Sequence, residues 1–215
     1  SLTHGYHSGG GVLSGGPYVS SVDKIDYAND TATAAPVGPL SNSIRAVAAA
    51  GNKDFGYITG GKPGPVTTTN RIDYSSDTGT TPTKGPMTAT FVYFAGTGNQ
   101  SYGYFTGSSP ASSTNASTLN RIDYSNDTPT AALKGNMSTA RYAPTASGNA
   151  SYGYWAGGRD TAPATTSIVD RVDYGNDTAT MVAKGPLISA RYYMSSFSNS
   201  DYGWFGGGRP NSSRT

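Results

Sequence analysis

Four arginines and two tyrosines in this sequence provide positive charge and aromatic rings, a combination suited to binding a ligand. They are Arg45, Arg141, Tyr142, Arg159, Arg191 and Tyr192. Arginine makes bidentate contacts to carboxylates, and Arg and Tyr are enriched where binding energy concentrates. We therefore treat the six as hypothetical ligand-binding residues. The alternative for Arg45, Arg141 and Arg191 is a salt bridge between neighbouring repeats.

Residues that could support catalysis or hold a metal are scarce. His4 and His7 are the only histidines, both near the N-terminus, and the chain has no cysteine. The Asp pairs, such as Asp123 and Asp127, recur in every repeat, whereas a catalytic residue is normally unique. We expect repeated aspartates to cap turns. The sequence thus predicts no enzyme, no metal site and no cofactor.

Composition narrows the class of protein further. Of the 215 residues, 13% are charged, the net charge is +2, and 35% are hydrophobic. The sequence has no basic stripe of the kind that predicts nucleic-acid binding. It also has no long apolar stretch of the kind that predicts a membrane span. The 16 tyrosines are regularly spaced, and such aromatic content favours order over disorder.

Two independent motifs repeat along the chain. The first is Lys-Ile-Asp-Tyr-Ala-Asn-Asp-Thr at 24–31, which recurs with Arg in first place at 71–78, 121–128 and 171–178. The second is a glycine-doublet segment at 56–61, matched at 103–108, 153–158, 203–208 and, in degenerate form, at 5–10. Repeats of about fifty residues indicate an array of identical structural units. We place them near 5–55, 56–102, 103–152 and 153–202, with a partial unit at 203–215, in one domain spanning 1–215.

Each unit reads as four short strands. In the last complete copy these are 142–147, 151–156, 167–174 and 178–183, separated by Gly- and Asn-rich turns. Period-two alternation in the third strand predicts that Ile72, Ile122 and Val172 are buried at equivalent sites. The same reading expects Arg71, Arg121 and Arg171 to pair with a carboxylate or to lie across a tyrosine.

Four antiparallel strands in about fifty residues, repeated, are typical of a β-propeller blade; a β-solenoid is the alternative. The glycine-doublet strand 154–158, the segment 121–128 and the stretches 136–141 and 186–191 resemble the kelch repeat, which implies an all-β propeller of kelch-like four-stranded blades. The units are also similar to repeat proteins of marine bacteriophages and bacteria. Some kelch-type propellers are copper oxidases with a cysteine-linked tyrosine, which this cysteine-free chain excludes.

Counting strands gives three, four, four, four and two, which completes neither a four-bladed nor a five-bladed ring. This count predicts further repeats in a longer polypeptide. The kelch resemblance places Arg45, Arg141 and Arg191 where blades join, on the face carrying loops 62–69, 107–118 and 157–167. Variable loops on a rigid scaffold favour a binding module.

The predicted function is therefore non-enzymatic: an adhesin, or a propeller that binds a surface glycan or protein receptor, extracellular or on a virion such as a phage tail. Glycan binding predicts exposed aromatic residues and carboxylates clustered on the loop face. The alternative is a structural spacer or decoration protein that contacts other subunits of a virion or an extracellular assembly. We expect neither nucleic acid nor membrane as a partner.

Overall fold

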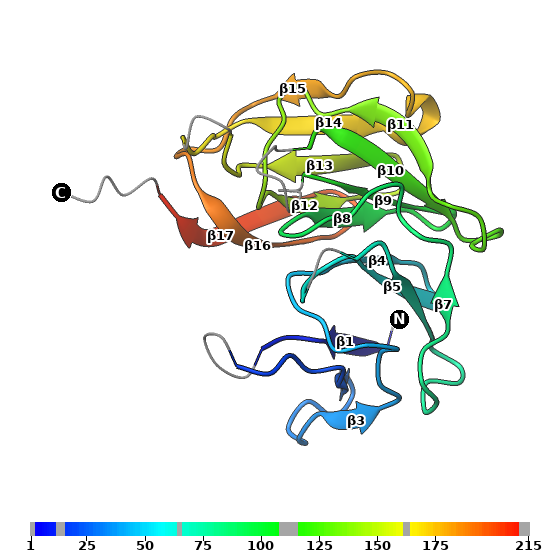
Figure 1. Cartoon of the computed structure of the whole chain (residues 1–215). Helices are drawn as coiled ribbons and strands as arrows, with labels where there is room; N and C mark the ends of the chain where they lie inside the picture. Colours follow the sequence, from blue (N-terminus) through cyan, green and yellow to red (C-terminus); the bar gives the residue numbers. More distant parts are fainter. Residues whose placement is uncertain (1–2, 12–15, 64–65, 108–115, 161–163, 211–215) are drawn as a thin grey trace.

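The computed structural model describes residues 3–11, 16–63, 66–107, 116–160 and 164–210, and in these ranges the chain is all-β (Figure 1). The seventeen strands of the described ranges are β1 His4–Ser8, β2 Val22–Asp26, β3 Ala35–Val37, β4 Ala48–Gly51, β5 Phe55–Thr59, β6 Thr69–Asp73, β7 Thr83–Lys84, β8 Ala95–Gly98, β9 Tyr102–Thr106, β10 Thr118–Asp123, β11 Ala132–Asn136, β12 Thr145–Gly148, β13 Tyr152–Ala156, β14 Val169–Asp173, β15 Val182–Lys184, β16 Tyr192–Ser198 and β17 Gly203–Arg209. A single 3-10 turn, η1 Tyr174–Asn176, follows β14.

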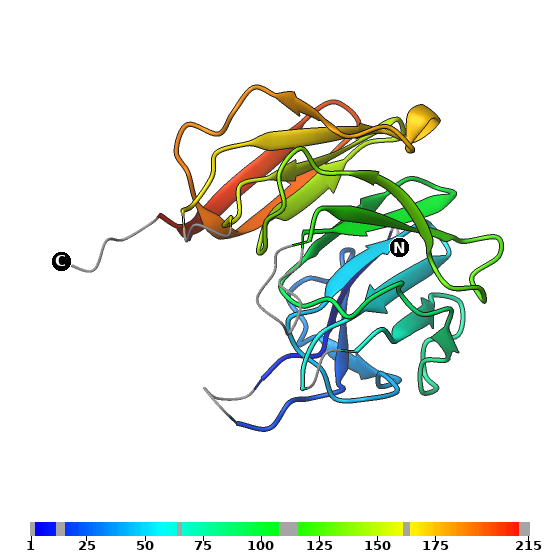
Figure 2. The same ribbon diagram turned by 45° about the horizontal axis from the view of Figure 1, so that its top comes forward.

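Consecutive strands pair antiparallel and build five sheets in chain order. Sheet one is β1–β3; sheets two, three and four are β4–β7, β8–β11 and β12–β15; sheet five is β16–β17. The expected count of three, four, four, four and two strands is confirmed. Figures 1 and 2 show the sheets following one another along the molecule, and within the described residues none of them closes on itself.

The first strands of sheets two to five form the line along which the sheets meet. β4 packs against β8, β8 against β12, and β12 against β16. Hydrophobic clusters fill the space between neighbouring sheets; one joins Tyr57 of sheet two to Phe105 and Ile122 of sheet three. Because each apolar face is covered by the next sheet, the array is stabilised by stacking of like units.

Third-strand aliphatic residues occupy equivalent buried sites, as the alternation predicts. Ile72, Ile122 and Val172 are all buried, and each pairs with a glycine of the second strand. At Gly103, opposite Ile122, a Cβ would lie 2.7 Å from the Oη of Tyr124, so a tyrosine occupies the space that glycine leaves. The prediction of equivalent core positions is confirmed.

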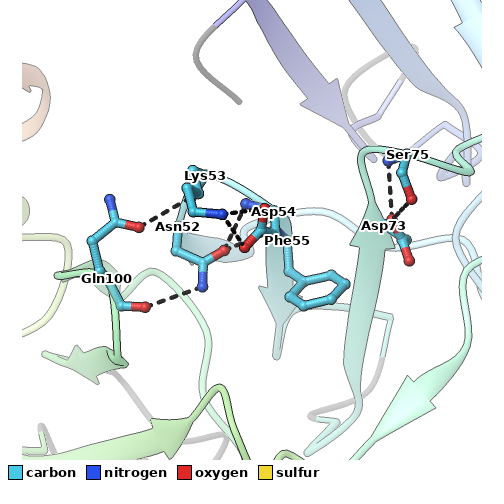
Figure 3. Close-up of polar contacts among 7 residues, drawn as sticks. All are labelled: Asn52, Lys53, Asp54, Phe55, Asp73, Ser75 and Gln100. Atoms are coloured by element: carbon cyan, nitrogen blue, oxygen red, sulfur yellow. Dashed lines mark hydrogen bonds and ion pairs between the residues drawn. The ribbon is translucent and has the colours of Figure 1, made fainter.

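The first aspartate of the repeated motif caps the turn after the third strand. The Oδ1 of Asp73 accepts hydrogen bonds from the backbone N–H and the hydroxyl of Ser75 (Figure 3). The same backbone bond recurs at Asp26, Asp123 and Asp173. These Asx turns explain why the motif carries aspartate here, and they confirm the predicted capping role.

An asparagine caps the turn between first and second strands. The Oδ1 of Asn52 accepts from the N–H groups of Asp54 and Phe55, and its Nδ2 donates to the carbonyl of Gln100 in the next sheet (Figure 3). Asn99 and Asn149 repeat both sets of bonds. One side chain thus closes a turn and links two sheets.

Two strands begin three or more residues later than the sequence suggested. The first strand of sheet four starts at Thr145 instead of residue 142, because Ala143 has a φ of 52° and breaks the extended run. Its last strand starts at Val182 instead of residue 178. Residues 177 and 181 bond instead to sheet three: Gly135 N–H donates to the carbonyl of Asp177, and Met181 N–H donates to that of Asn136.

Candidate functional site

Four residues in left-handed backbone conformation mark the line where the sheets meet. Ala46, Tyr93, Ala143 and Tyr193 have φ between 52° and 57°. Their backbones are bonded in series: Tyr93 N–H donates to Ala46, Ala143 to Tyr93 and Tyr193 to Ala143, at N···O distances of 3.3, 2.6 and 3.2 Å. Non-glycine residues rarely adopt this conformation. It persists here because each residue is fixed by the neighbouring sheet.

Aromatic and cationic side chains gather around this line, and we call them the central cluster. Its members are Tyr18, Arg45, Lys62, Tyr93, Tyr142, Arg159, Tyr192 and Tyr193. The Arg159 guanidinium lies between two rings, 5.8 Å from the Tyr142 centroid and 5.1 Å from that of Tyr192. These are cation–π distances.

The remaining contacts extend the central cluster across the sheets. The Tyr192 and Tyr193 rings are 4.7 Å apart, and Tyr193 meets Tyr93 edge-on at 5.6 Å. Lys62 lies 5.5 Å from the Tyr93 centroid, and Arg45 lies 4.9 Å from that of Tyr18. The central cluster therefore contains residues from segments that are far apart in the sequence.

Isolated backbone bridges position the cluster. Arg45 pairs with Lys62, and Tyr142 pairs with Arg159, which itself pairs with Thr165. The Arg45–Lys62 and Tyr142–Arg159 bridges tie the segment before a first strand to the segment after the glycine doublet, where loops 62–69 and 157–167 begin. The central cluster consequently lies at the base of two of the three loops expected to form a binding face; residues 108–115 of the third lie outside the described ranges.

Tyr193 is the most accessible aromatic residue of the cluster, with 46% of its surface exposed. Partial burial, together with the nearby Tyr93 and Tyr142, raises the pKa of its hydroxyl to about 12, and the Arg159 charge opposes this shift. The hydroxyl therefore stays neutral at physiological pH. It can donate a hydrogen bond, and its ring offers an apolar face next to a fixed cation.

The six sequence-predicted residues divide into two groups. Tyr142, Arg159, Tyr192 and Arg45 join the central cluster. Arg141 and Arg191 do not join the central cluster. They directly precede Tyr142 and Tyr192, and their guanidinium groups donate to the backbone carbonyls of Trp155 and Phe205. The carbonyls of Ile44, Phe91 and Arg191 each accept a hydrogen bond from the N–H of a glycine of the doublet. Ile44, and not Arg45, is therefore the structural equivalent of Arg191 and of Arg141, so the sequence alignment of Arg45 with these arginines is wrong by one residue.

Arg141 is fully buried. Its Nη1 donates to the Oδ2 of Asp170 at 2.7 Å, and its Nη2 donates to the carbonyl of Trp155 at 3.0 Å. Burial lowers the pKa of the guanidinium, while the Asp170 charge opposes the shift. The side chain is unavailable to a surface ligand. It forms a salt bridge, as the alternative expected, but with β14 of sheet four, the sheet that its own segment leads into, instead of between two sheets.

The second aspartate of each motif holds neighbouring sheets together. The Oδ2 of Asp127 accepts from the Tyr57 hydroxyl at 2.9 Å and from Arg71 at 2.8 Å, while its Oδ1 lies 3.2 Å from Lys84. Asp177 does the same with Tyr104, Arg121 and Lys134. Asp77 accepts from Tyr6 and Lys24. Sequence reasoning assigned these aspartates to turn caps and missed this clasp.

The electrostatics of the clasp follow from its geometry. Burial alone would raise the pKa of Asp127, but hydrogen bonds from Tyr57 and Lys84 and the Arg71 charge outweigh burial, so the pKa lies below its usual range. Asp77 and Asp177 behave likewise. The expected stacking of the repeated arginines is also present, with Arg121 4.3 Å from the Tyr102 centroid.

The sequence reading missed Tyr18, Lys62, Tyr93 and Tyr193 of the central cluster. One available signal was the tyrosine pair 192–193, because the second residue after each of Ile44, Phe91, Arg141 and Arg191 falls on the central line. The other members come together only through pairing between sheets. Within the described residues, no group of three His, Cys, Asp or Glu side chains could hold a metal ion.

Comparisons with known proteins leave the chain without an assigned family. No protein-family model matches it. A search of curated proteins finds no significant match. No helix in the described part of the chain is long and apolar enough to cross a membrane.

Proposed function

We propose that this protein is a non-enzymatic binding module whose central cluster holds an anionic glycan. The observation that carries the proposal is that the Arg159 guanidinium lies within cation–π distance of both Tyr142 and Tyr192, next to the half-exposed Tyr193. Tyrosine rings offer flat apolar faces with a polar tip, which suits a sugar ring. Arginine presents a planar fork that matches a carboxylate or sulfate group.

The charge of the cluster selects among glycans. We expected exposed aromatic rings with carboxylates; among the described residues, the rings of the cluster lie beside the cations Arg45, Lys62 and Arg159. Cations favour acidic sugars over neutral ones. Polysaccharides bearing uronic acids or sulfate groups are therefore the ligand class that the cluster fits best.

We also propose that the sheets are kelch-like propeller blades. The side-by-side packing of the first strands β4, β8, β12 and β16 supports this, because first strands line the axis of such a fold. The resemblance to phage and bacterial repeat proteins supports a location on a virion or a cell surface. The ligand would then be a host or matrix glycan.

A structural role is the second candidate, and the repeated clasp favours it. Asp77, Asp127 and Asp177 join successive sheets by one scheme, which makes the array extensible. A spacer or decoration protein needs such cohesion and no ligand. Binding to acidic saccharides separates the two functions.

A glycan array tests the proposal directly. Purified protein is applied to neutral, carboxylated and sulfated saccharides at low and moderate salt. We expect binding to acidic saccharides that weakens as salt rises. Absence of binding to every acidic saccharide at low salt would contradict the proposal and leave the structural role.

A further inference from the structure

Each junction between sheets joins a set of donors on one sheet to an aspartate on the next. A further donor set in sheet four and a further aspartate in sheet one have no such partner among the described residues. At the junction of sheets three and four, Tyr104, Arg121 and Lys134 hold Asp177. The N–H of Gly135 also donates to the Asp177 carbonyl at 2.8 Å. The two preceding junctions repeat the backbone bond at Gly38 and Gly85.

Sheet four carries a further set of donors. Tyr154, Arg171 and Lys184 occupy the positions of Tyr104, Arg121 and Lys134 in the repeat. Within the described residues, no carboxylate pairs with them. A Cβ on Gly185 would meet nothing within 4 Å, whereas one on Gly135 would collide with the carbonyl of Ala179. This half of a junction is open.

Sheet one carries the matching acceptor. Asp30 follows β2 at the motif position of Asp77, Asp127 and Asp177, and it is exposed. Tyr27, in the same turn, is 61% exposed. The equivalent Tyr174 is half-buried and stacks on Tyr104 at 4.7 Å.

A hollow beside β17 lies where the tyrosine equivalent to Tyr174 of sheet four would pack against sheet five. It has a volume of about 230 Å³ and is lined in part by Gly148, Tyr154 and Gly203. In the complete sheet four, Tyr174 fills the corresponding space: its Oη lies 2.7 Å from a Cβ placed on Gly153. A Cβ on Gly203 would meet no tyrosine, its nearest neighbour being a serine hydroxyl at 3.5 Å.

Charge gives an independent match. Arg191 stands in sheet five where Arg141 stands in sheet four, and each donates to a backbone carbonyl fourteen residues on. Arg141 pairs with Asp170 of the third strand. The position of Asp170 is taken by Asn70 in sheet two, Asn120 in sheet three and the exposed Asp23 in sheet one. Only sheet one therefore offers the carboxylate that Arg191 would need.

We propose that β17 of one molecule pairs with β2 of a second copy of this chain, in place of that copy's β1. Because β1 and β17 carry the same strand of the repeat, Gly203 would face Ile25 and Phe205 would face Asp23, as Gly5 and His7 do within one chain. The composite sheet β16–β17–β2–β3 has four strands. Tyr27 enters the hollow, Asp30 meets Arg171 and Lys184, and Asp23 meets Arg191.

The occupant is a second molecule because of the arrangement of the array. Three complete sheets separate β16–β17 from β1–β3 along the chain, and among the described strands none of sheet one is hydrogen-bonded to a strand of sheet five. Among the described strands, β17 pairs with β16 alone, and a strand edge of this kind is a template for another chain. Exchange of an equivalent strand needs no new interface. The inference is independent of the proposed glycan binding, since the central cluster takes no part in it.

Disulfide trapping tests this pairing, because the chain has no cysteine of its own. Tyr202→Cys combined with Asp26→Cys places thiols at positions that face each other in complete sheets, as Tyr152 and Asp173 do. We expect a covalent oligomer under non-reducing conditions that reductant converts to monomer. The matched control, Tyr202→Cys with Asp73→Cys, should stay monomeric, since Asp73 lies in β6 of a complete four-stranded sheet.

Two outcomes would overturn the proposal. An intrachain disulfide, seen as a monomer without free thiols, would show that β17 reaches β2 of its own chain. No disulfide in either variant would show that β17 does not meet β2 at all.

Sedimentation equilibrium of the unmodified chain provides a second test that does not depend on cysteine variants. We expect concentration-dependent association, weakened at least tenfold by Asp30→Arg, which opposes Arg171 and Lys184. The control Asp54→Arg alters an exposed turn outside the junctions and should leave association unchanged. A monomer at every concentration, or association unaffected by Asp30→Arg, would contradict the proposal.

Discussion

Arg141 and Asp170 form an ion pair with both side chains fully buried, at an Nη1–Oδ2 distance of 2.7 Å. The other two complete sheets have different residues at these two positions of the repeat: Ile44 and Asn70 in sheet two, and Phe91 and Asn120 in sheet three. Within one chain, an apolar residue accompanies asparagine and arginine accompanies aspartate. In the three complete sheets, charge at this site therefore occurs as a pair or not at all.

This pairing predicts the result of a double-mutant cycle. Asp170→Asn leaves a buried guanidinium uncompensated and should lower the free energy of unfolding by about 3–5 kcal/mol. Adding Arg141→Phe recreates the Phe91–Asn120 arrangement and should recover most of that loss. Urea denaturation of the single and double variants measures both. Additive losses in the double variant would show that the two residues act separately.

The clasp between sheets predicts acid sensitivity. The pKa of each of Asp77, Asp127 and Asp177 lies below its usual range, so these carboxylates stabilise the fold above the unfolded pKa of about 3.9. That stabilisation should fall as pH drops from about 4 through the lower folded pKa values. Denaturant unfolding at pH 7 to 2.5 measures the effect. In Asp127→Asn the decline should be shallower, and an unchanged slope would contradict the assignment.

Core packing predicts a large effect at one isoleucine and none at another. Ile122 is 5% exposed between sheets two and three, so Ile122→Ala should cost about 2–5 kcal/mol. Ile188 is fully exposed, and Ile188→Ala is the matched control with a change of about 0.5 kcal/mol or less. Thermal and urea unfolding compare the two variants. Equal losses would place Ile122 outside the core.

How far the sequence predicts this structure can be judged at particular residues. Period-two alternation predicted the burial of Ile72, Ile122 and Val172, because strand geometry depends on neighbours in the chain. The two aspartates of each motif look alike in sequence, yet Asp123 caps a local turn and Asp127 clasps another sheet. That difference arises from packing between sheets, which no local pattern encodes.

The candidate site was predicted in part for the same reason. Tyr142, Arg159 and Tyr192 were identified by charge and aromatic character, and the structure brings them together. Arg141 has the same composition signal but points into the core, where Asp170 meets it. Tyr93 joins the cluster through a left-handed backbone that only the neighbouring sheets impose.

The most direct test of the account is calorimetric titration of an acidic saccharide into matched tyrosine variants. Tyr192→Ala removes a ring next to Arg159 in the central cluster, and Tyr152→Ala removes one 4.3 Å from Arg171 at the far end of β13. We predict at least tenfold weaker binding for Tyr192→Ala, with its fold intact by circular dichroism, and unchanged affinity for Tyr152→Ala. Equal affinity of both variants and the unmodified chain would contradict the assignment of the central cluster as the binding site.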